Sequence, residues 1–218
     1  MKKIVFVHTL PALMAQFEKL FREQLTGELK TMHMLDTFLL EGMGEGGALE
    51  KLNSNRLYNT LKSAEMTGAD AIVVTCAAIS KKARELRFLF STPLFTIDDT
   101  VGEAAIACGE KLTVFASGEG SCKATVALIQ AAADAAGKQV EITKVHVPQA
   151  FEALKRSDIE TMDKLLLEDA KKISGVDKVV FAQASMMHLA PAVEEICGIS
   201  VLTSPDLCVN NVKKALGV

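Results

Sequence analysis

The sequence has few aromatic side chains and no excess of either charge. Its 218 residues include no tryptophan and one tyrosine, and 24 basic side chains are balanced by 27 acidic ones, for a net charge of −3. Binding to a nucleic-acid backbone requires a basic face, and base stacking requires exposed aromatic rings. The composition therefore disfavours nucleic acid as a partner.

Paired cysteines and long apolar runs are also missing. The five cysteines are an odd number and none forms a Cys-x-x-Cys pair, so neither a disulfide framework nor a zinc cluster is indicated. Reduced thiols in the cytoplasm are the simplest expectation. No stretch reaches the roughly 18 apolar residues of a membrane span. The apolar residues 4–7 near the start stop at His8, so we interpret them as a buried strand rather than a signal peptide.

What the sequence does contain is an alternation of short apolar runs with longer amphipathic ones. Apolar residues make up 49% of the chain, enough for a sizeable core. Strands are expected at residues 4–7, 29–35, 71–75, 94–97, 112–116, 140–147, 179–182 and 201–203. Helices are expected at residues 11–25, 51–67, 77–90, 122–136, 159–173, 190–197 and 209–216. This order predicts an α/β protein with parallel sheets covered on both faces.

The pattern restarts half-way along the chain. Residues 70–76 and 177–183 both begin with aspartate, continue as an apolar strand and end on a polar or thiol side chain, 107 positions apart. Residues 4–7 match residues 112–115 at an offset of 108. A nearly constant offset indicates a duplication. The sequence therefore predicts two similar parallel-sheet α/β domains related by a pseudo-twofold axis.

We expect the first domain at residues 1–98 with 205–218, carrying Cys76, and the second at 99–204, carrying Gln183. In open α/β sheets, ligands bind beyond the carboxyl ends of the strands. If the two domains face each other, these ends converge on one cleft, where the site is expected. The strand-end residues are His8, Thr9, Cys76, Asp98, Ser117, Gln183 and Thr203.

Cys76 has the most informative position, since it follows a buried strand and opens the helix expected at residues 77–90. The partial positive charge and free N–H groups of a helix N-terminus stabilise a thiolate. The N–H groups around Ala77 and Ala78 can also hold a substrate carboxylate. The alternative is an inert core thiol, because cysteine is among the most buried residue types.

Other features are weaker candidates. The glycines at 42, 44 and 47 match the spacing of a dinucleotide-binding fingerprint, but Glu45 would repel a pyrophosphate and the segment does not join the first strand to its helix. We expect a loop there instead. His188 is an alternative second proton carrier, although a helix-start histidine is the simpler interpretation. Arg84 and Arg87 are expected on the solvent face of their helix.

Residues 68–76, Gly-Ala-Asp-Ala-Ile-Val-Val-Thr-Cys, resemble the aspartate/glutamate/hydantoin racemase superfamily, with Arg56 upstream and residues 93–98 downstream. The likeness continues through residues 112–117, 181–186 and 201–205. The resemblance implies two pseudo-symmetric domains with the site between them. It also implies chemistry at the carbon next to a carboxylate, driven by one or two cysteines without pyridoxal phosphate, another cofactor or a metal.

Two departures from the family pattern affect that chemistry. The second catalytic cysteine of the family corresponds to Gln183, and an amide neither removes nor delivers a proton as a base or acid. Where the family usually has Ser, Thr or Asn after the first cysteine, this chain has Ala77 and Ala78. The side chains and backbone expected to line the substrate are then those of His8, Thr9, Ala77, Ala78, Asp98, Ser117, Ser121, Ala184 and Ser185.

The sequence therefore predicts an enzyme that acts on a small amino or dicarboxylic acid, with Cys76 as base or nucleophile and Gln183 orienting the substrate or a developing enolate. Racemisation with another second base, decarboxylation with one-sided protonation and isomerisation through a thiol adduct all stay open. The alternative is a small-carboxylate-binding protein that has lost turnover. The sequence does not set the oligomeric state; a homodimer is the commonest assembly of soluble enzymes.

Overall fold

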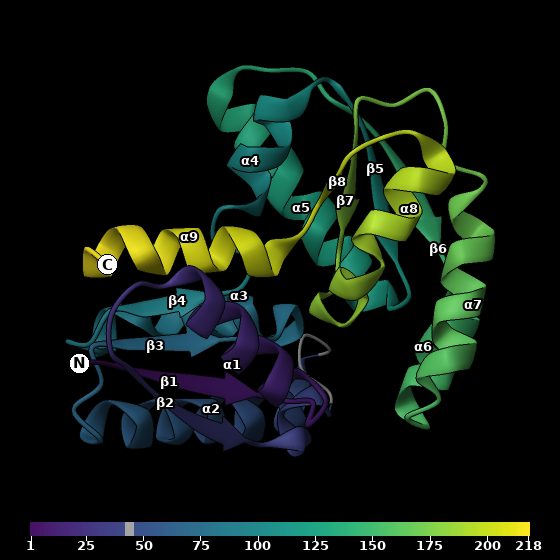
Figure 1. Ribbon diagram of the computed structural model, residues 1–218. Helices are drawn as coiled ribbons and strands as arrows, with labels where there is room; N and C mark the ends of the chain where they lie inside the picture. Colours follow the sequence, from purple (N-terminus) through teal and green to yellow (C-terminus); the bar gives the residue numbers. More distant parts are fainter. Residues whose placement is uncertain (42–45) are drawn as a thin grey trace. The chain divides into compact units, whose positions relative to one another are not determined.

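The computed structural model describes residues 1–41 and 46–218. By its internal contacts the chain divides into two compact units (Figure 1). The first comprises Met1–Asp99 and Pro205–Val218, and the second comprises Thr100–Ser204. The backbone therefore passes twice between the units.

The first unit is built on a four-stranded parallel sheet with strand order β2-β1-β3-β4. The strands are β1 (Lys2–His8), β2 (Leu29–Leu35), β3 (Ala71–Val74) and β4 (Leu94–Thr96). The central strand β3 is wholly apolar and buried, and β1 is apolar and buried from Ile4 to Val7, as expected for parallel strands covered on both faces.

The helix α1 covers one face of this sheet, and the helices α2 and α3 cover the other (Figure 1). Phe17 and Phe21 of α1 (Leu13–Gln24) pack on Phe6 of β1 with ring centroids 6.1 and 4.8 Å apart. The opposite face, formed by Val5, Val7, Ile72 and Val74, packs against α2 and α3. The remaining bounds are α2 (Gly47–Met66), α3 (Ala77–Leu86), α9 (Ser204–Leu216) and the 3₁₀ helices η1 (Thr37–Leu40) and η2 (Arg87–Leu89).

The second unit repeats the strand order of the first, as β6-β5-β7-β8. Its strands are β5 (Lys111–Ala116), β6 (Glu141–His146), β7 (Lys178–Phe181) and β8 (Val201–Leu202). Its helices are α4 (Val101–Cys108), α5 (Glu119–Ala136), α6 (Pro148–Lys155), α7 (Ile159–Ala170), η3 (Ala184–Leu189) and α8 (Ala190–Cys197). The predicted α/β class with two similar parallel-sheet halves is confirmed.

The repeated aspartate has the same structural role in both units. The Asp70 carboxylate accepts a hydrogen bond from the Lys3 N–H at 2.8 Å, and the Asp177 carboxylate accepts one from the Lys111 N–H at 2.9 Å. Hydrogen bonds from these backbone N–H groups lower the pKa of both carboxyl groups. Each aspartate thus ties the loop before one central strand to the start of the other.

Several expected boundaries differ from the structure. The helix expected at residues 77–90 ends at Leu86 and continues as a 3₁₀ turn to Leu89. The sequence analysis missed α4 and α6, each of eight residues. The helix α4 is apolar over most of its length, so it lacks the alternation of apolar and polar positions that reveals a surface helix. The glycine-rich segment lies largely outside the described residues, because positions 42–45 are not among them.

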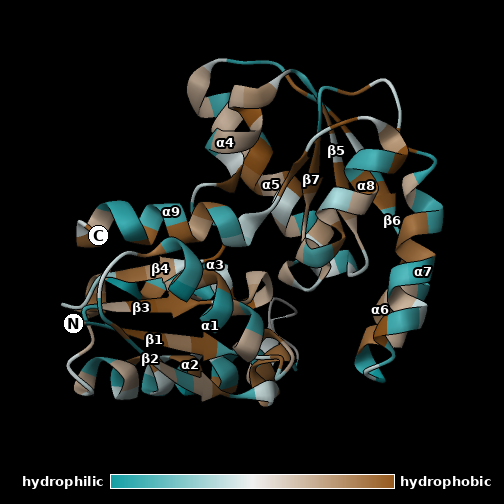
Figure 2. Cartoon of the chain, in the orientation of Figure 1, coloured by the Kyte–Doolittle hydropathy of each residue, from teal (hydrophilic) through white to brown (hydrophobic). Residues whose placement is uncertain are grey.

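Apolar residues are concentrated in the strands, while the outer faces of the helices are mainly hydrophilic (Figure 2). In the described ranges, no helix combines the length and the apolar character needed to cross a bilayer.

Candidate active site

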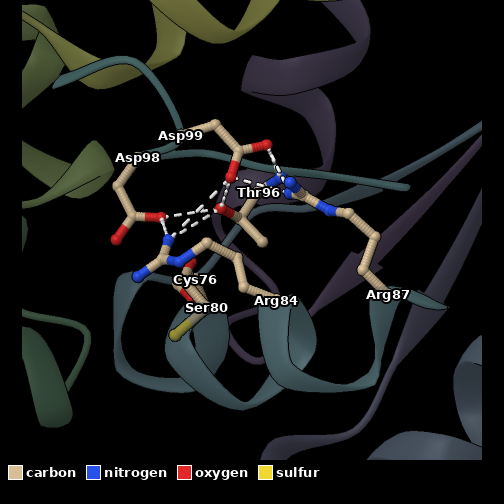
Figure 3. Close-up of polar contacts among 7 residues, drawn as sticks. All are labelled: Cys76, Ser80, Arg84, Arg87, Thr96, Asp98 and Asp99. Atoms are coloured by element: carbon tan, nitrogen blue, oxygen red, sulfur yellow. Dashed lines mark hydrogen bonds and ion pairs between the residues drawn. The ribbon is translucent and has the colours of Figure 1, made fainter. Parts of the chain in front are cut away.

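Cys76 lies between β3 and α3, two positions after the last residue of β3 and directly before the first residue of α3. It has extended backbone angles (φ −125°, ψ 118°), and its thiol is buried although the residue as a whole is half-buried. The Ser80 hydroxyl donates to the Cys76 carbonyl oxygen at 3.0 Å, which holds the first turn of α3 (Figure 3). Near the thiol are the Thr9 hydroxyl and the N–H groups of Ala78 and Ile79.

Burial is the dominant influence on this thiol and raises the pKa of Cys76 above its ordinary value. The Thr9 hydroxyl and the N–H groups of Ala78 and Ile79 act in the opposite direction, and the negative charge of Asp98 adds to the increase. The helix N-terminus therefore favours the thiolate, as the sequence analysis expected, but desolvation outweighs it. At neutral pH the free protein holds Cys76 as a neutral thiol.

Two buried hydroxyls beside the candidate residues are not saturated. Among the described residues, Thr9 Oγ1 and Ser185 Oγ are buried without a well-formed hydrogen bond. Thr9 follows β1, and Ser185 lies in the first turn of η3, two positions after Gln183. Buried polar atoms are rarely left in this state. Both hydroxyls therefore have hydrogen-bonding capacity left for a polar group of a ligand.

Asp98 is held in an ion-pair network at the end of β4 (Figure 3). Arg84 Nη1 donates to Asp98 Oδ1 at 2.7 Å and to Thr96 Oγ1 at 3.0 Å. Arg87 Nη2 donates to both oxygens of Asp99, at 2.7 and 2.6 Å. The two arginines thus fasten the end of α3 and η2 to the end of β4. They do not merely cover a solvent face, and Asp98 Oδ1 is held by Arg84.

Replacing Arg84 by alanine should lower the free energy of unfolding by roughly 3 kcal/mol, because it leaves a buried carboxylate without its partner. The Asp98 side chain is 5% exposed. Urea unfolding monitored by circular dichroism measures the loss. Lys123→Ala is the matched control, since it breaks an exposed ion pair with Glu119 and should leave the midpoint unchanged. Equal midpoints for both variants would show that the Arg84 pair contributes nothing.

In the second unit, Gln183 follows β7, and its side chain forms hydrogen bonds with other residues of the same unit. Gln183 Oε1 accepts hydrogen bonds from the Ser117 N–H at 2.8 Å, the Ser117 hydroxyl at 3.0 Å and the Gly118 N–H at 2.8 Å. A Cβ atom on Gly118 would lie 3.3 Å from Gln183 Nε2. The absence of a side chain at Gly118 therefore lets the Gln183 amide approach the backbone closely. His146 Nε2 lies 3.0 Å from the Ser117 carbonyl oxygen.

These three donors are the type of group that the sequence analysis assigned to a substrate carboxylate. In the structure, the side-chain oxygen of Gln183 accepts all three hydrogen bonds and so stands where a carboxylate oxygen was expected. We call the three donors of Ser117 and Gly118 the cradle. Ser117 is therefore engaged within the chain. Ser121 is half-buried in the first turn of α5, and Ala184 is buried where η3 begins.

Two histidines have partners within the chain. His188 is exposed and its Nε2 lies 2.9 Å from Asp163 Oδ1. His8 is fully buried, with Nε2 2.9 Å from His33 Nδ1 and Nδ1 2.9 Å from Thr75 Oγ1. Its ring is therefore not open to a substrate, contrary to the expectation from the sequence. Burial, and then the neighbouring His33, lowers the pKa of His8 to about 4.

Sequence reasoning missed most of these partners. The partners of Gln183 and His8 lie at least 25 positions away in the chain, and no local pattern marks them. Within the described part of the chain, no group of three or more His, Cys, Asp or Glu side chains could hold a metal ion. The candidate site of the first unit therefore consists of Cys76, Thr9 and the N-terminal N–H groups of α3.

The family comparison covers most of the chain. The family model described as Asp/Glu/Hydantoin racemase matches residues 12–212. The chain belongs to this family. The matched range contains Cys76, Ala77, Ala78 and Gln183. No curated protein sequence matches the chain.

Solved structures share the fold at low sequence identity. The aspartate racemase of Picrophilus torridus is 16% identical with a TM-score of 0.70, over 100% of this chain and 95% of that one. The glutamate racemase RacE1 of Bacillus anthracis is 13% identical with a TM-score of 0.74, over 99% and 82%. The allantoin racemase of Klebsiella pneumoniae is 14% identical with a TM-score of 0.64, over 100% and 89%. At these identities the likeness establishes the fold of this racemase-family chain.

Proposed function

We propose that this chain is a cofactor-independent enzyme that acts at the carbon next to the carboxylate of a small amino or dicarboxylic acid. Cys76 is its base or nucleophile. The proposal depends on the groups around the Cys76 thiol. Cys76 follows a strand, lies at the N-terminus of the ten-residue helix α3, and is close to the buried Thr9 hydroxyl, which has no well-formed hydrogen bond.

The chemistry follows from those surroundings. To act as a base, Cys76 first loses its proton to solvent water, and the Thr9 hydroxyl with the N–H groups of Ala78 and Ile79 stabilises the resulting anion. The thiolate then takes the proton from the α-carbon, and the bonding electrons move into the carboxylate as an enediolate. Backbone N–H groups are suited to stabilise this developing charge. The proton returns to the carbon from the thiol or from water.

Gln183 limits the outcome of this reaction. An amide cannot supply the second proton carrier, and its oxygen already accepts hydrogen bonds from Ser117 and Gly118. With Cys76 as the one base, protons leave and return on one face of the planar intermediate. Exchange with solvent should therefore be faster than racemisation. The same single thiol is compatible with decarboxylation followed by one-sided protonation, or with isomerisation through a thiol adduct.

Deuterium incorporation tests this proposal across many acids, so the substrate need not be identified first. Each enantiomer of a panel of small amino acids, and a set of dicarboxylic acids, is incubated with the protein in D₂O and followed by mass spectrometry and chiral chromatography. We expect one enantiomer of at least one amino acid to gain deuterium with little inversion. No incorporation across the panel would contradict the enzymatic proposal. Equal racemisation of both enantiomers would contradict a single base.

A second candidate function is binding of a small carboxylate without turnover. It is favoured by the raised pKa of the Cys76 thiol and by the engagement of Gln183 within the chain. Isothermal titration calorimetry with the same panel separates the two functions. Binding of an acid that never gains deuterium would support the binding protein, whereas incorporation would support the enzyme.

The raised pKa predicts how Cys76 reacts with iodoacetamide in the absence of substrate. Its alkylation should be slow at neutral pH and should rise only above about 8.5, where an ordinary cysteine ionises. Mass spectrometry of the tryptic peptide that spans residues 63–81 follows this thiol alone. Cys108, which is exposed, serves as the internal comparison and should react faster at pH 7. Equal rates at pH 7 would contradict the burial argument.

A further inference from the structure

We propose that His8 is a positioning residue for Cys76. Its imidazole holds Thr75 at the end of β3 and thereby keeps the Thr9 hydroxyl against the Cys76 thiol on the opposite face of the sheet. This inference rests on the proposed role of Cys76. It assigns to His8 a role different from substrate contact.

The argument begins with the register of β1 and β3. Val7 pairs with Val74, and the Thr75 N–H donates to the Val7 carbonyl oxygen at 3.1 Å. The following rungs therefore bring together His8 with Thr75, and then Thr9 with Cys76. Because side chains alternate along strands, these two rungs point to opposite faces of the sheet. The hydrogen bond between His8 and Thr75 therefore lies on one face of the sheet, and the Thr9 hydroxyl lies near the Cys76 thiol on the other.

Packing confirms which face His8 occupies. Its ring centroid lies 5.8 Å from that of Phe6 and 6.0 Å from that of Phe17 of α1. Cys76 instead packs with the apolar cluster on the side of α2 and α3. His8 therefore cannot reach the thiol itself, and any influence on it passes through the backbone ends of β1 and β3.

A polar ring in this position requires an explanation beyond packing. A phenyl ring would fill the space among Phe6, Phe17 and His33 without the cost of burying two ring nitrogens. That cost is offset because both nitrogens of His8 have partners, His33 Nδ1 and Thr75 Oγ1, each at 2.9 Å. The two hydrogen bonds are what histidine provides and phenylalanine does not.

The charged groups around His8 favour one arrangement of its protons. Beyond His33 of β2, Glu18 of α1 lies with its carboxylate 3.5 Å from His33 Nε2, and Arg22 pairs with that carboxylate at 2.8 Å. A carboxylate beside His33 Nε2 favours the proton on that nitrogen, so His33 Nδ1 accepts from His8 Nε2–H. The Thr75 hydroxyl has two acceptors within reach, His8 Nδ1 at 2.9 Å and the Val7 carbonyl oxygen at 3.2 Å, and this tautomer leaves the nearer one, Nδ1, able to accept. From β3, Thr75 is the group that faces the ring.

Amide substitutions separate the two hydrogen bonds. The amide of asparagine stands at the distance of Nδ1 from Cβ, so His8→Asn keeps the bond to Thr75. The amide of glutamine reaches the position of Nε2, so His8→Gln keeps the bond to His33 and loses Thr75. His8→Phe keeps the packing and loses both. If His8 acts through Thr75, only His8→Gln and His8→Phe should disturb Cys76.

The measurement is the rate of Cys76 alkylation by iodoacetamide against pH, without substrate, so that failure here is distinguishable from failure of the enzymatic proposal. We expect His8→Phe and His8→Gln to lower the rate at pH 8 by about fivefold, the factor that corresponds to one net hydrogen bond. His8→Asn should stay near the unsubstituted protein. Circular dichroism and thermal unfolding verify that each variant is folded.

A double-mutant cycle with Thr9→Val decides the route. Thr9→Val alone should lower the rate by a similar factor, and adding His8→Phe or His8→Gln should change it no further, because residues acting through one contact are not additive. If the rate reductions of the two single variants multiply in the double variant, His8 does not act on Cys76 through Thr9. An unchanged alkylation profile in folded His8→Phe, or in folded His8→Gln if the phenylalanine variant does not fold, would reduce His8 to a packing residue.

Discussion

Cys76→Ala should abolish the exchange of deuterium into the substrate, with a loss of about 1,000-fold or more, because a general base of this kind contributes roughly 10²–10⁴-fold to a rate. Alanine keeps the Cβ atom and the backbone N–H groups of α3, so binding of the acid should survive. The substitution removes only the small thiol group, and we expect the free energy of unfolding to fall by only ~1 kcal/mol. Mass spectrometry of the substrate and urea unfolding of the protein measure the two quantities.

Cys108→Ala is the matched control. Cys108 lies at the end of α4 and is exposed, so its replacement should alter neither exchange nor stability. Undiminished exchange in Cys76→Ala would remove this thiol from the mechanism. A loss of exchange in both variants would point to a general sensitivity to cysteine replacement.

Gln183→Cys should introduce racemisation of the acid that Cys76 already exchanges. The family resemblance puts a second catalytic thiol at this position. The substitution removes the carbonyl oxygen that accepts hydrogen bonds from the Ser117 and Gly118 N–H groups. A thiol at the start of η3, near these vacated donors, is in surroundings that favour a thiolate. Chiral chromatography of the product measures the gain, which we expect to be weak but above that of the unsubstituted protein.

Gln183→Ala is the matched control, because it vacates the same donors without adding a thiol. If racemisation appears in the cysteine variant and not in the alanine variant, the thiol is the cause. If both variants racemise, the gain comes from opening the cradle of Ser117 and Gly118. Loss of exchange in both variants would indicate that the Gln183 amide itself is needed to bind the acid.

The structure also explains why some site residues could be identified from sequence and others could not. The position of Cys76 depends on a local succession, an apolar strand followed by a helix, and this succession is legible in residues 71–90. The repeated aspartates, Asp70 and Asp177, are likewise recognisable because each stands directly before such a strand. In both cases the signal lies within a few residues of the feature it predicts.

The protonation state of Cys76 and the hydrogen bonds of Gln183 could not be predicted from the local sequence. Burial of the thiol results from packing of several segments, and it outweighs the helix N-terminus that the sequence reveals. Gln183 meets Ser117 across 66 positions because β5 and β7 are neighbours in the sheet. His8 faces α1 rather than a ligand for a similar reason, since one-residue alternation along a strand decides which face it occupies.

The amino-acid sequence by itself therefore determined the α/β class, the two similar halves and the strand-end location of the candidate residues, because these depend on the periodicity of apolar side chains and on short local motifs. Only the tertiary structure decided which of those residues are free. It commits Asp98 to Arg84, Ser117 to Gln183, and His8 to Thr75 and His33. The reason is physical: hydrogen bonds and desolvation depend on which distant segments the sheet order brings into contact.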